Sequence, residues 1–377
     1  MPADAILRKV SQSEQVNGPA ETQLESNYVS MLRLDAQDTI SSAKGQRIPA
    51  LDFTKGALVL IMVFYHWINY FIGPQWKYYP YLRFLTPSFI FITGFMISHV
   101  YLSKYATYDS RLWRRLFTRG WKLLAIFLVL NLACNLFIPI LGTGIGAQSV
   151  PTLANLFTIF VSGNLPIAGD KLASFSILVP ISYLLMLSGM LILPLRRYKY
   201  TFHIACAFLL SSIGSLRVFG VGSYNLEFVA IGMIGVLFGF LSVDRVNDAL
   251  RHYYVLIPVY LGYVIAITIW NVPFLLLVLG VLLNLMILYA VGHAGSKTGV
   301  IKDEIILLGK YSLFGYLSQI AILQVLNAGF HRVNLGLAAM PVSFVVALTL
   351  TIASTRAVDY ARAKVARADR LYKAIFA

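Results

Sequence analysis

The chain has 377 residues, of which 58% are hydrophobic and 12% charged, and its mean hydropathy is +0.72. This composition is too apolar for a soluble domain of that length and is typical of a protein that crosses a membrane many times. The net charge of +15 would suit a nucleic-acid partner, but the placement of the basic residues, described below, excludes that interpretation.

The N-terminal segment, residues 1–45, is polar throughout, with frequent Gln, Ser, Glu and Asp and no apolar run. A cleavable signal peptide requires an apolar region near its start, and a packed domain requires more apolar residues than this segment has. We therefore expect a disordered cytosolic tail.

Ten apolar runs of the length that spans a bilayer follow this tail. They lie near residues 56–73, 82–103, 120–141, 174–195, 201–219, 224–243, 253–271, 273–293, 304–326 and 338–356. The fold expected for residues 46–356 is therefore all-α, a polytopic transmembrane bundle of about ten helices. The segment 142–173 contains a short apolar piece, 152–161, that we expect to be an interfacial or re-entrant helix.

The basic residues are distributed unevenly between the two sides of this arrangement. With both termini placed in the cytosol, 25 of the 31 Lys and Arg fall in cytosolic segments, five in outer loops, and Lys310 inside the ninth run. This split follows the positive-inside rule. It predicts a multi-pass protein of the cytoplasmic (inner) membrane with a basic cytosolic C-terminal tail, 357–377, and no nucleic-acid partner.

The first apolar run carries two ionisable residues that would lie on the same side of a helix. Lys55 and His66 are 11 positions apart, which on a helix is three turns plus about 20°, so both lie on one stripe. Lys55 would lie near the cytosolic boundary and His66 near the middle of the hydrocarbon core. Ionisable groups at that depth are costly and usually line a functional cavity; the alternative is a histidine satisfied by a neighbouring helix.

Two polar residues share the face of His66, because Asn69 and Tyr70 follow it at i+3 and i+4. A neutral imidazole with such neighbours suits a general base that deprotonates a hydroxyl or an amine. A proton relay in a transporter would need similar groups. The residues alone leave both interpretations open.

A basic face precedes the third run. Arg111, Arg114, Arg115, Arg119 and Lys122 stand at i, i+3, i+4, i+8 and i+11, which is one side of a helix. Arginines at a membrane boundary suit phosphate or pyrophosphate recognition through paired hydrogen bonds. Structural anchoring of the helix is the alternative.

Three further residues in the apolar runs are candidates for packing or function. Gly94 stands among bulky residues and lets either another helix or a ligand approach closely. Lys310 and the hydroxyl and amide residues that follow it are expected to face the bundle interior. Glu227, at the start of the sixth run, is either a site residue or a solvated carboxylate.

No metal site or bound cofactor is predicted. The six histidines form no HxxxH or HxxE pair, and Cys134 and Cys206 both fall in apolar runs, where they act as small hydrophobic residues. No G-x-x-x-x-G-K-[ST] or G-x-S-x-G motif is present.

Three segments resemble motifs of the membrane acyltransferase-3 superfamily, in the family's order. Residues 47–66 share its opening: Leu-Asp, a base followed by Gly, and then a histidine after ten intervening residues. Residues 89–95 are similar to the second-span signature FF-x-x-SGF, with Thr93 in place of Ser. Residues 308–317 resemble the segment LGKYSLxxYLxH, and we expect Ser318 to replace its histidine. Branches that succinylate glucans or N-acetylate terminal glucosamine open similarly.

The resemblance implies acyl transfer from acyl-CoA, acetyl-CoA or succinyl-CoA, to a sugar hydroxyl of an extracytoplasmic or lipid-linked glycan. His66 would be the catalytic base. The donor and substrate would be held by a larger set: Asp52, Lys55, Asn69, Tyr70, Arg111, Arg114, Arg115, Arg119, Lys310 and Tyr316. Acyl-CoA, the glycan and the lipid bilayer are the expected partners, and assembly into a homo-oligomer is left open. The alternative is a transporter or flippase that uses His66 and Lys310 in one pathway.

Overall fold

The computed structural model describes most of the chain after the expected tail. The described residues are 48–72, 79–102, 110–140, 158–163, 175–195, 198, 200–241, 253–270, 273–294, 299–333 and 340–376. The expected tail 1–45, nearly all of 142–173 and its apolar piece up to residue 157 lie outside them, so those predictions stay untested.

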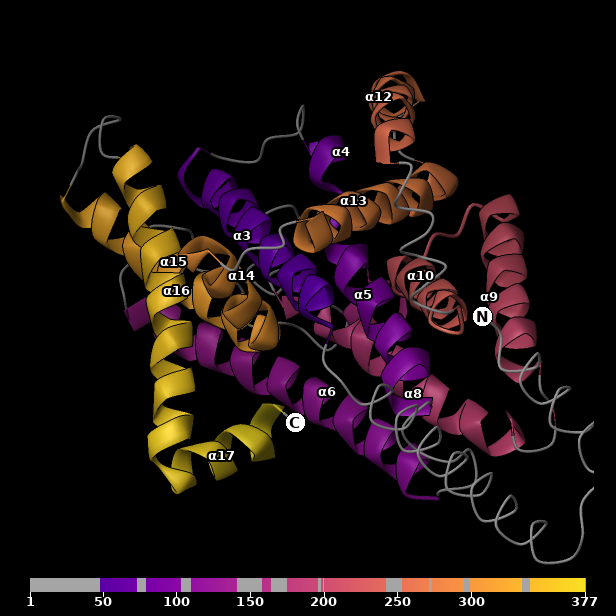
Figure 1. Ribbon diagram of the computed structural model, residues 1–377, viewed down its shortest axis with the longest axis horizontal. Coiled ribbons are helices and arrows are strands. Elements are labelled where there is room, and N and C mark those ends of the chain that lie inside the picture. The colour runs from indigo at the N-terminus through magenta and orange to yellow at the C-terminus, as the bar shows by residue number, and fades with distance from the viewer. Residues whose placement is uncertain are drawn as a thin grey trace, which may run out of the picture. The chain divides into compact units, whose positions relative to one another are not determined.

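Regular structure in the described residues is entirely helical (Figure 1). The helices are α3 (Pro49–Phe71), α4 (Tyr79–Leu82), α5 (Leu85–Met96), the π-helix η1 (Ile97–Leu102), α6 (Ser110–Ile140), α8 (Leu178–Leu195), α9 (Thr201–Val218), α10 (Tyr224–Phe238), α12 (Tyr253–Trp270), α13 (Phe274–Ala294), α14 (Val300–Lys310), α15 (Ser312–Val333), α16 (Met340–Lys364) and α17 (Ala366–Phe376).

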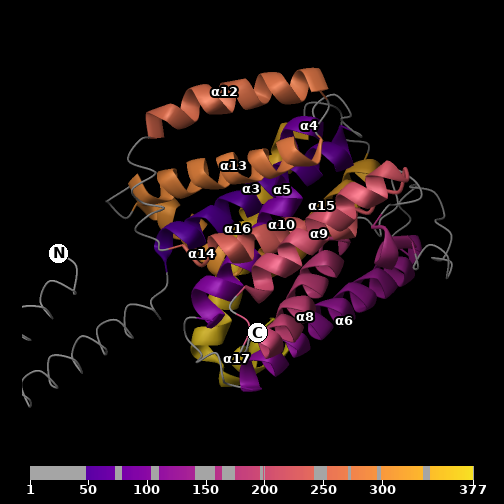
Figure 2. The ribbon, with the colours of Figure 1, turned by 90° about the vertical axis from the view of Figure 1, so that its right-hand side faces the viewer.

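Eight helices of the described part are long and apolar enough to cross a membrane, and two more apolar helices, Tyr224–Phe238 and Tyr254–Trp270, are shorter. Figure 2 shows α12 running along α13, and α8 lying beside α6. The predicted polytopic helical bundle is thereby confirmed.

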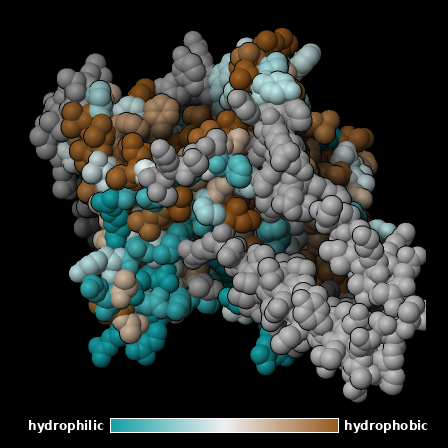
Figure 3. Space-filling model, in the orientation of Figure 1, coloured by the Kyte–Doolittle hydropathy of each residue, from teal (hydrophilic) through white to brown (hydrophobic). Residues whose placement is uncertain are grey.

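The surface of these helices is apolar where a bilayer would surround it. Phe208 on α9 and Leu261 and Ile265 on α12 are all more than half exposed, which would be costly in water. Figure 3 shows hydrophilic residues gathered around α17 and the adjoining end of α16, with apolar surface above them. The polar region therefore marks one end of the bundle.

The ninth run differs from its prediction. It was expected as one span over residues 304–326, but the helix ends at Lys310 and a new one begins at Ser312, with Tyr311 between them. The short α14 has 11 residues, about 16 Å of helix, and does not cross a bilayer. Lys310 therefore lies at a helix end rather than within a span.

The last run also extends beyond its expected end at residue 356. Helix α16 continues to Lys364, and α17 follows after Val365. The segment 357–376 is thus helical.

Backbone contact between helices explains the glycines of the recognised motifs. A Cβ atom on Gly56 would lie 1.8 Å from the carbonyl oxygen of Ile305, and one on Gly309 would lie 1.7 Å from that of Asp52. A Cβ atom on Gly94 would lie 1.9 Å from the carbonyl oxygen of Gly232. These glycines bring α3 against α14 and α5 against α10, so for Gly94 the structure shows helix packing.

Candidate functional site

His66 lies on the fifth turn of α3, among aromatic rings. Its ring centroid is 5.1 Å from that of Tyr65 and 6.4 Å from that of Tyr316 on α15. The side chain is half-buried, and no described residue forms a hydrogen bond with its ring. Among the described residues, therefore, no neighbouring helix satisfies the hydrogen-bonding groups of His66.

The polar residues expected beside His66 are held by other partners. Asn69 forms a side-chain hydrogen bond with Tyr65, and the amide of Gln324 donates to the Tyr70 hydroxyl at 3.3 Å. Tyr316 is an electrostatic neighbour of both Tyr65 and Tyr70. The result is a group of tyrosine hydroxyls around His66, which we call the tyrosine cluster (Tyr65, Tyr70 and Tyr316).

The polar residues after Tyr316 divide between two environments. Ser318 donates to the carbonyl of Gly315 at 3.2 Å and accepts from Ser354 on α16 at 3.4 Å. Gln319 is fully buried, and both atoms of its amide lack a partner among the described residues. Counting the twelve-position motif from Leu308 also puts its histidine position at Gln319, so the expectation that placed it at Ser318 was wrong by one residue.

The first turns of α3 and the end of α14 bring three predicted donor residues to one place, which we call the Lys55 end. Lys55 pairs with Asp52 at 2.5 Å, and the backbone of Asp52 touches Gly309. Lys310 pairs with Asp359 of α16 at 2.8 Å. Both lysine charges are thus already balanced by carboxylates, with which a donor phosphate would compete.

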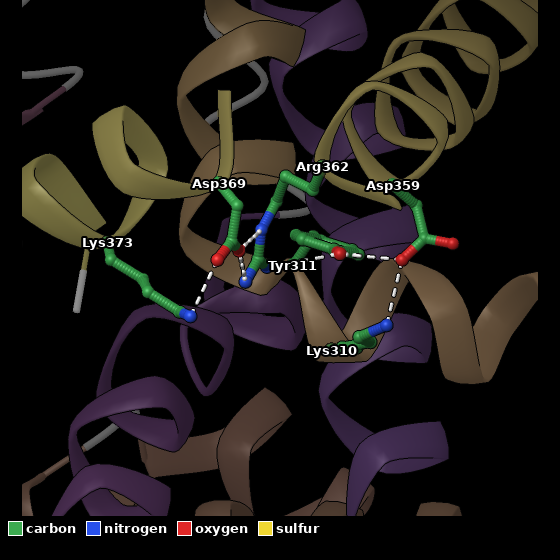
Figure 4. Close-up of polar contacts among 6 residues, drawn as sticks. All are labelled: Lys310, Tyr311, Asp359, Arg362, Asp369 and Lys373. Carbon is green, nitrogen blue, oxygen red and sulfur yellow. Dashed lines mark hydrogen bonds and ion pairs between the residues drawn. The ribbon is translucent and has the colours of Figure 1, made fainter. Parts of the chain in front are cut away.

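A polar cluster joins this end to the C-terminal helix (Figure 4). Tyr311 donates to Asp359 at 2.6 Å and accepts from Arg362 at 3.1 Å. Arg362 donates two hydrogen bonds to one oxygen of Asp369, at 2.9 and 2.7 Å, and Lys373 pairs with the other oxygen at 2.6 Å. Burial, followed by the hydrogen bond to Asp359, raises the pKa of Tyr311. Lys373 and Arg362 lower the pKa of Asp369. This cluster accounts for the break at Tyr311.

The predicted basic face lies on α6, where Arg111, Arg114 and Arg115 are exposed. Arg119 donates a hydrogen bond to the hydroxyl of Tyr101 in η1, and the guanidinium groups of Arg115 and Arg119 lie 5.8 and 5.9 Å from the Tyr101 ring centroid. Arg114 is exposed and lies beside Trp113. Among the described carboxylates, none pairs with Arg114 or Arg119. Arg111 is also exposed.

The basic face and the polar cluster meet at α17. Tyr372 of α17 stacks edge-on against Tyr311, with ring centroids 5.4 Å apart, and Arg119 is among its electrostatic neighbours. Burial raises the pKa of Tyr372. Figures 1 and 2 both show α17 close to α6. The predicted donor residues of α3, α6 and α14 therefore border one region.

At the opposite end of α3, which we call the Ile72 end, lies a cavity of about 370 Å³. Arg83, Arg217, Tyr224 and Glu227 line it, together with the loop 220–223. Glu227 is buried and accepts a hydrogen bond from Arg217 at 2.7 Å. Of the two interpretations left open for Glu227, the solvated carboxylate is excluded, because folding of the chain between α9 and α10 buries this side chain against an arginine.

Sequence reasoning missed Tyr65, Gln324, Arg83 and Arg217. The partners of Gln324, Arg83 and Arg217 lie outside their own apolar runs, so no spacing within one run signals them. Tyr65 has Asn69 at i+4 on α3, and that spacing could have signalled it. The dense tyrosines at 78–81 could have drawn attention to the Ile72 end. Among the described residues, no group of three His, Cys, Asp or Glu side chains could hold a metal ion.

Comparison with protein-family models, curated proteins and solved structures finds no match for this chain.

Proposed function

We propose that the chain is an integral membrane acyltransferase that transfers an acyl group from acyl-CoA to a sugar hydroxyl of an extracytoplasmic or lipid-linked glycan. The observation that carries the proposal is His66: a half-buried imidazole on the fifth turn of the apolar helix α3, beside the rings of Tyr65 and Tyr316 and without a hydrogen-bond partner among the described residues. A buried base without a structural partner is a mark of a chemical site. The motif resemblance supports the same reaction.

In the proposed reaction His66 accepts the proton of the sugar hydroxyl as its oxygen attacks the thioester carbonyl carbon. A carbon–oxygen bond forms and the carbon–sulfur bond breaks, and the imidazolium then gives its proton to the leaving thiolate, which departs as CoA. The hydroxyls of the tyrosine cluster would orient the acceptor. The unpaired amide of Gln319, at i+3 from Tyr316, is the described polar group most suited to the developing oxyanion.

The donor would bind at the Lys55 end. Coenzyme A carries several phosphates, which arginines recognise through charge-assisted hydrogen bonds. Arg111, Arg114, Arg115 and Arg119 offer such groups, and Lys55 and Lys310 border the same region. The 25-to-5 distribution of basic residues supports a cytosolic position for this end and for both termini, in a cytoplasmic membrane, with the acceptor on the other side.

The proposal includes ten spans. The eight long apolar helices and the two shorter ones, α10 and α12, together match the ten apolar runs of the sequence. An even number is needed to leave both termini on one side. Tilt and local thinning of the bilayer allow short helices to cross.

The alternative transporter used His66 and Lys310 in one pathway. Lys310 instead pairs with Asp359 at a helix end, next to α3 residues three turns from His66. The two residues therefore do not share one environment, and the binding and hydrolysis measurements described next separate transport from acyl transfer.

The test uses the full chain purified in detergent with acetyl-CoA and succinyl-CoA labelled in the acyl group. An acyltransferase should bind one of them and release its acyl group to water or to an added saccharide, and His66→Ala should remove that turnover while donor binding persists. Absence of both binding and thioester cleavage in folded protein would refute the proposal and favour transport.

A further inference from the structure

The cavity at the Ile72 end has the size of a sugar site. Its volume of about 370 Å³ falls in the range of small-molecule pockets, about 300–1,000 Å³. Lining by aromatic and charged side chains suits a saccharide better than an apolar ligand, because hydroxyl and acidic groups need polar partners.

The described lining of this cavity carries a net positive charge. Arg83 and Arg217 contribute two positive charges and Glu227 one negative charge. Arg217 donates one hydrogen bond to Glu227, whereas a guanidinium has five donors. The Arg217 side chain remains 45% exposed, so further donors of this group are accessible to a ligand.

Aromatic residues connect the cavity to His66. The Tyr65 ring, which touches His66, lies 6.2 Å from the Tyr79 ring. Tyr79 is an electrostatic neighbour of Tyr224 and Arg83, and the Arg83 guanidinium lies 5.8 Å from the Tyr224 ring centroid. A molecule seated in the cavity could thus extend along these rings towards the imidazole.

We propose that this cavity binds a carboxylate or phosphate group of the acceptor, so that the substrate is a negatively charged saccharide rather than a neutral one. The inference rests on the proposed function and specifies its acceptor. Arg83 and Arg217 would hold the anionic group, and the sugar would lie along Tyr224 and Tyr79 with its hydroxyl towards His66.

The experiment measures saccharide binding to the full chain in detergent by saturation-transfer NMR and calorimetry. The probes are a glucuronic-acid disaccharide, the glucose disaccharide of the same linkage, and inorganic phosphate. The acidic disaccharide should bind at least about tenfold more tightly than the neutral one, as expected for one charge-assisted hydrogen bond, and the difference should shrink as salt increases. Equal binding of the two disaccharides would overturn the proposal. Competition by phosphate below the concentration at which glucuronate alone competes would identify a phosphate group as the ligand.

Variants test the residues. Arg83→Gln should weaken binding of the acidic disaccharide by about 10–100-fold, and Arg83→Lys should weaken it less. Glu227→Gln, which removes the negative charge, should tighten it. Arg370→Gln, on an exposed position of α17, is the matched control and should leave binding unchanged. A folded Arg83→Gln protein with unchanged affinity would contradict the assignment.

A separate assay tests the proposed function: hydrolysis of the acyl-CoA thioester is measured in the same preparations without any acceptor. Hydrolysis with no preference for the acidic saccharide would defeat only the acceptor assignment. Loss of hydrolysis in the unmodified chain would defeat the acyltransferase itself.

Discussion

At the scale of single residues, His66 carries the sharpest prediction. His66→Ala should lower acyl transfer by about 10²–10⁴-fold, the usual contribution of a general base. Donor affinity and expression should change little, because no described residue depends on the ring for a hydrogen bond. The measurement is turnover of purified protein against donor binding by calorimetry. His203→Ala, an exposed histidine on α9, is the control; normal activity of the His66 variant with loss in the control would reverse the assignment.

Lys55 should behave as a charge rather than as a proton donor. Lys55→Arg should keep the apparent KM for acyl-CoA within a few fold, since the charge opposite Asp52 is retained. Lys55→Met should raise that KM strongly and leave Asp52 without its partner. Steady-state kinetics measure the KM for acyl-CoA of the two variants, and Lys302→Met of α14 is the control. Equal and complete loss in both Lys55 variants would indicate a packing defect or a proton-transfer role instead.

The position of His66 was predictable from the sequence because depth and helical phase depend only on spacing along one run. The tyrosine cluster was only partly predictable. Tyr70 and Tyr316 stood out as polar residues in apolar runs, but the contact between Tyr316 and His66 joins helices about 250 residues apart in the sequence. The cavity at the Ile72 end combines Arg83 with residues of the segment 217–227, and no local pattern in the sequence predicts that these two segments meet.

At the scale of elements, the α3–α14 contact depends on two glycines. Gly309→Ala would place a methyl group 1.7 Å from the carbonyl oxygen of Asp52, so the helices must separate. We expect a loss of about 1–3 kcal/mol in the free energy of unfolding, as for other overpacked contacts. The midpoint of thermal or denaturant unfolding in detergent measures it.

Gly214→Ala is the matched control for that substitution. Gly214 lies within α9, and a Cβ atom there would meet nothing within 4 Å. Alanine should therefore be neutral or stabilise the helix by about 0.5–1 kcal/mol. A Gly309 variant as stable as the Gly214 variant would show that α3 and α14 do not pack backbone to backbone.

The positions of most helices followed from hydropathy, because a helix surrounded by lipid must be apolar along its whole length. The break at Tyr311 did not follow from it. Residues 304–326 contain enough apolar residues for one span, but Asp359 and Arg362 hold the Tyr311 hydroxyl from 48 and 51 residues away. A hydropathy average over one short segment cannot reveal hydrogen bonds between residues that far apart in the sequence.

At the scale of the whole molecule, charge and hydropathy predict the topology. Reporter fusions after residues 150 and 272 should read outside and those after 200 and 250 inside, because the basic segments should remain in the cytosol. Alkaline phosphatase and fluorescent-protein fusions report the two sides. A reversed pattern would place the Lys55 end outside and remove cytosolic acyl-CoA as the donor.

The polar cluster that links Tyr311 to α16 and α17 has a consequence for how the protein folds during its synthesis. The residues that hold the Tyr311 hydroxyl lie 48 and 51 residues after it, so this junction can reach its final geometry only after α16 has been synthesised. Until then α14 lacks its restraint from α16 and α17. A nascent chain cut short before Asp369 would thus carry every apolar run and still present an incomplete protein to the membrane's quality-control proteases.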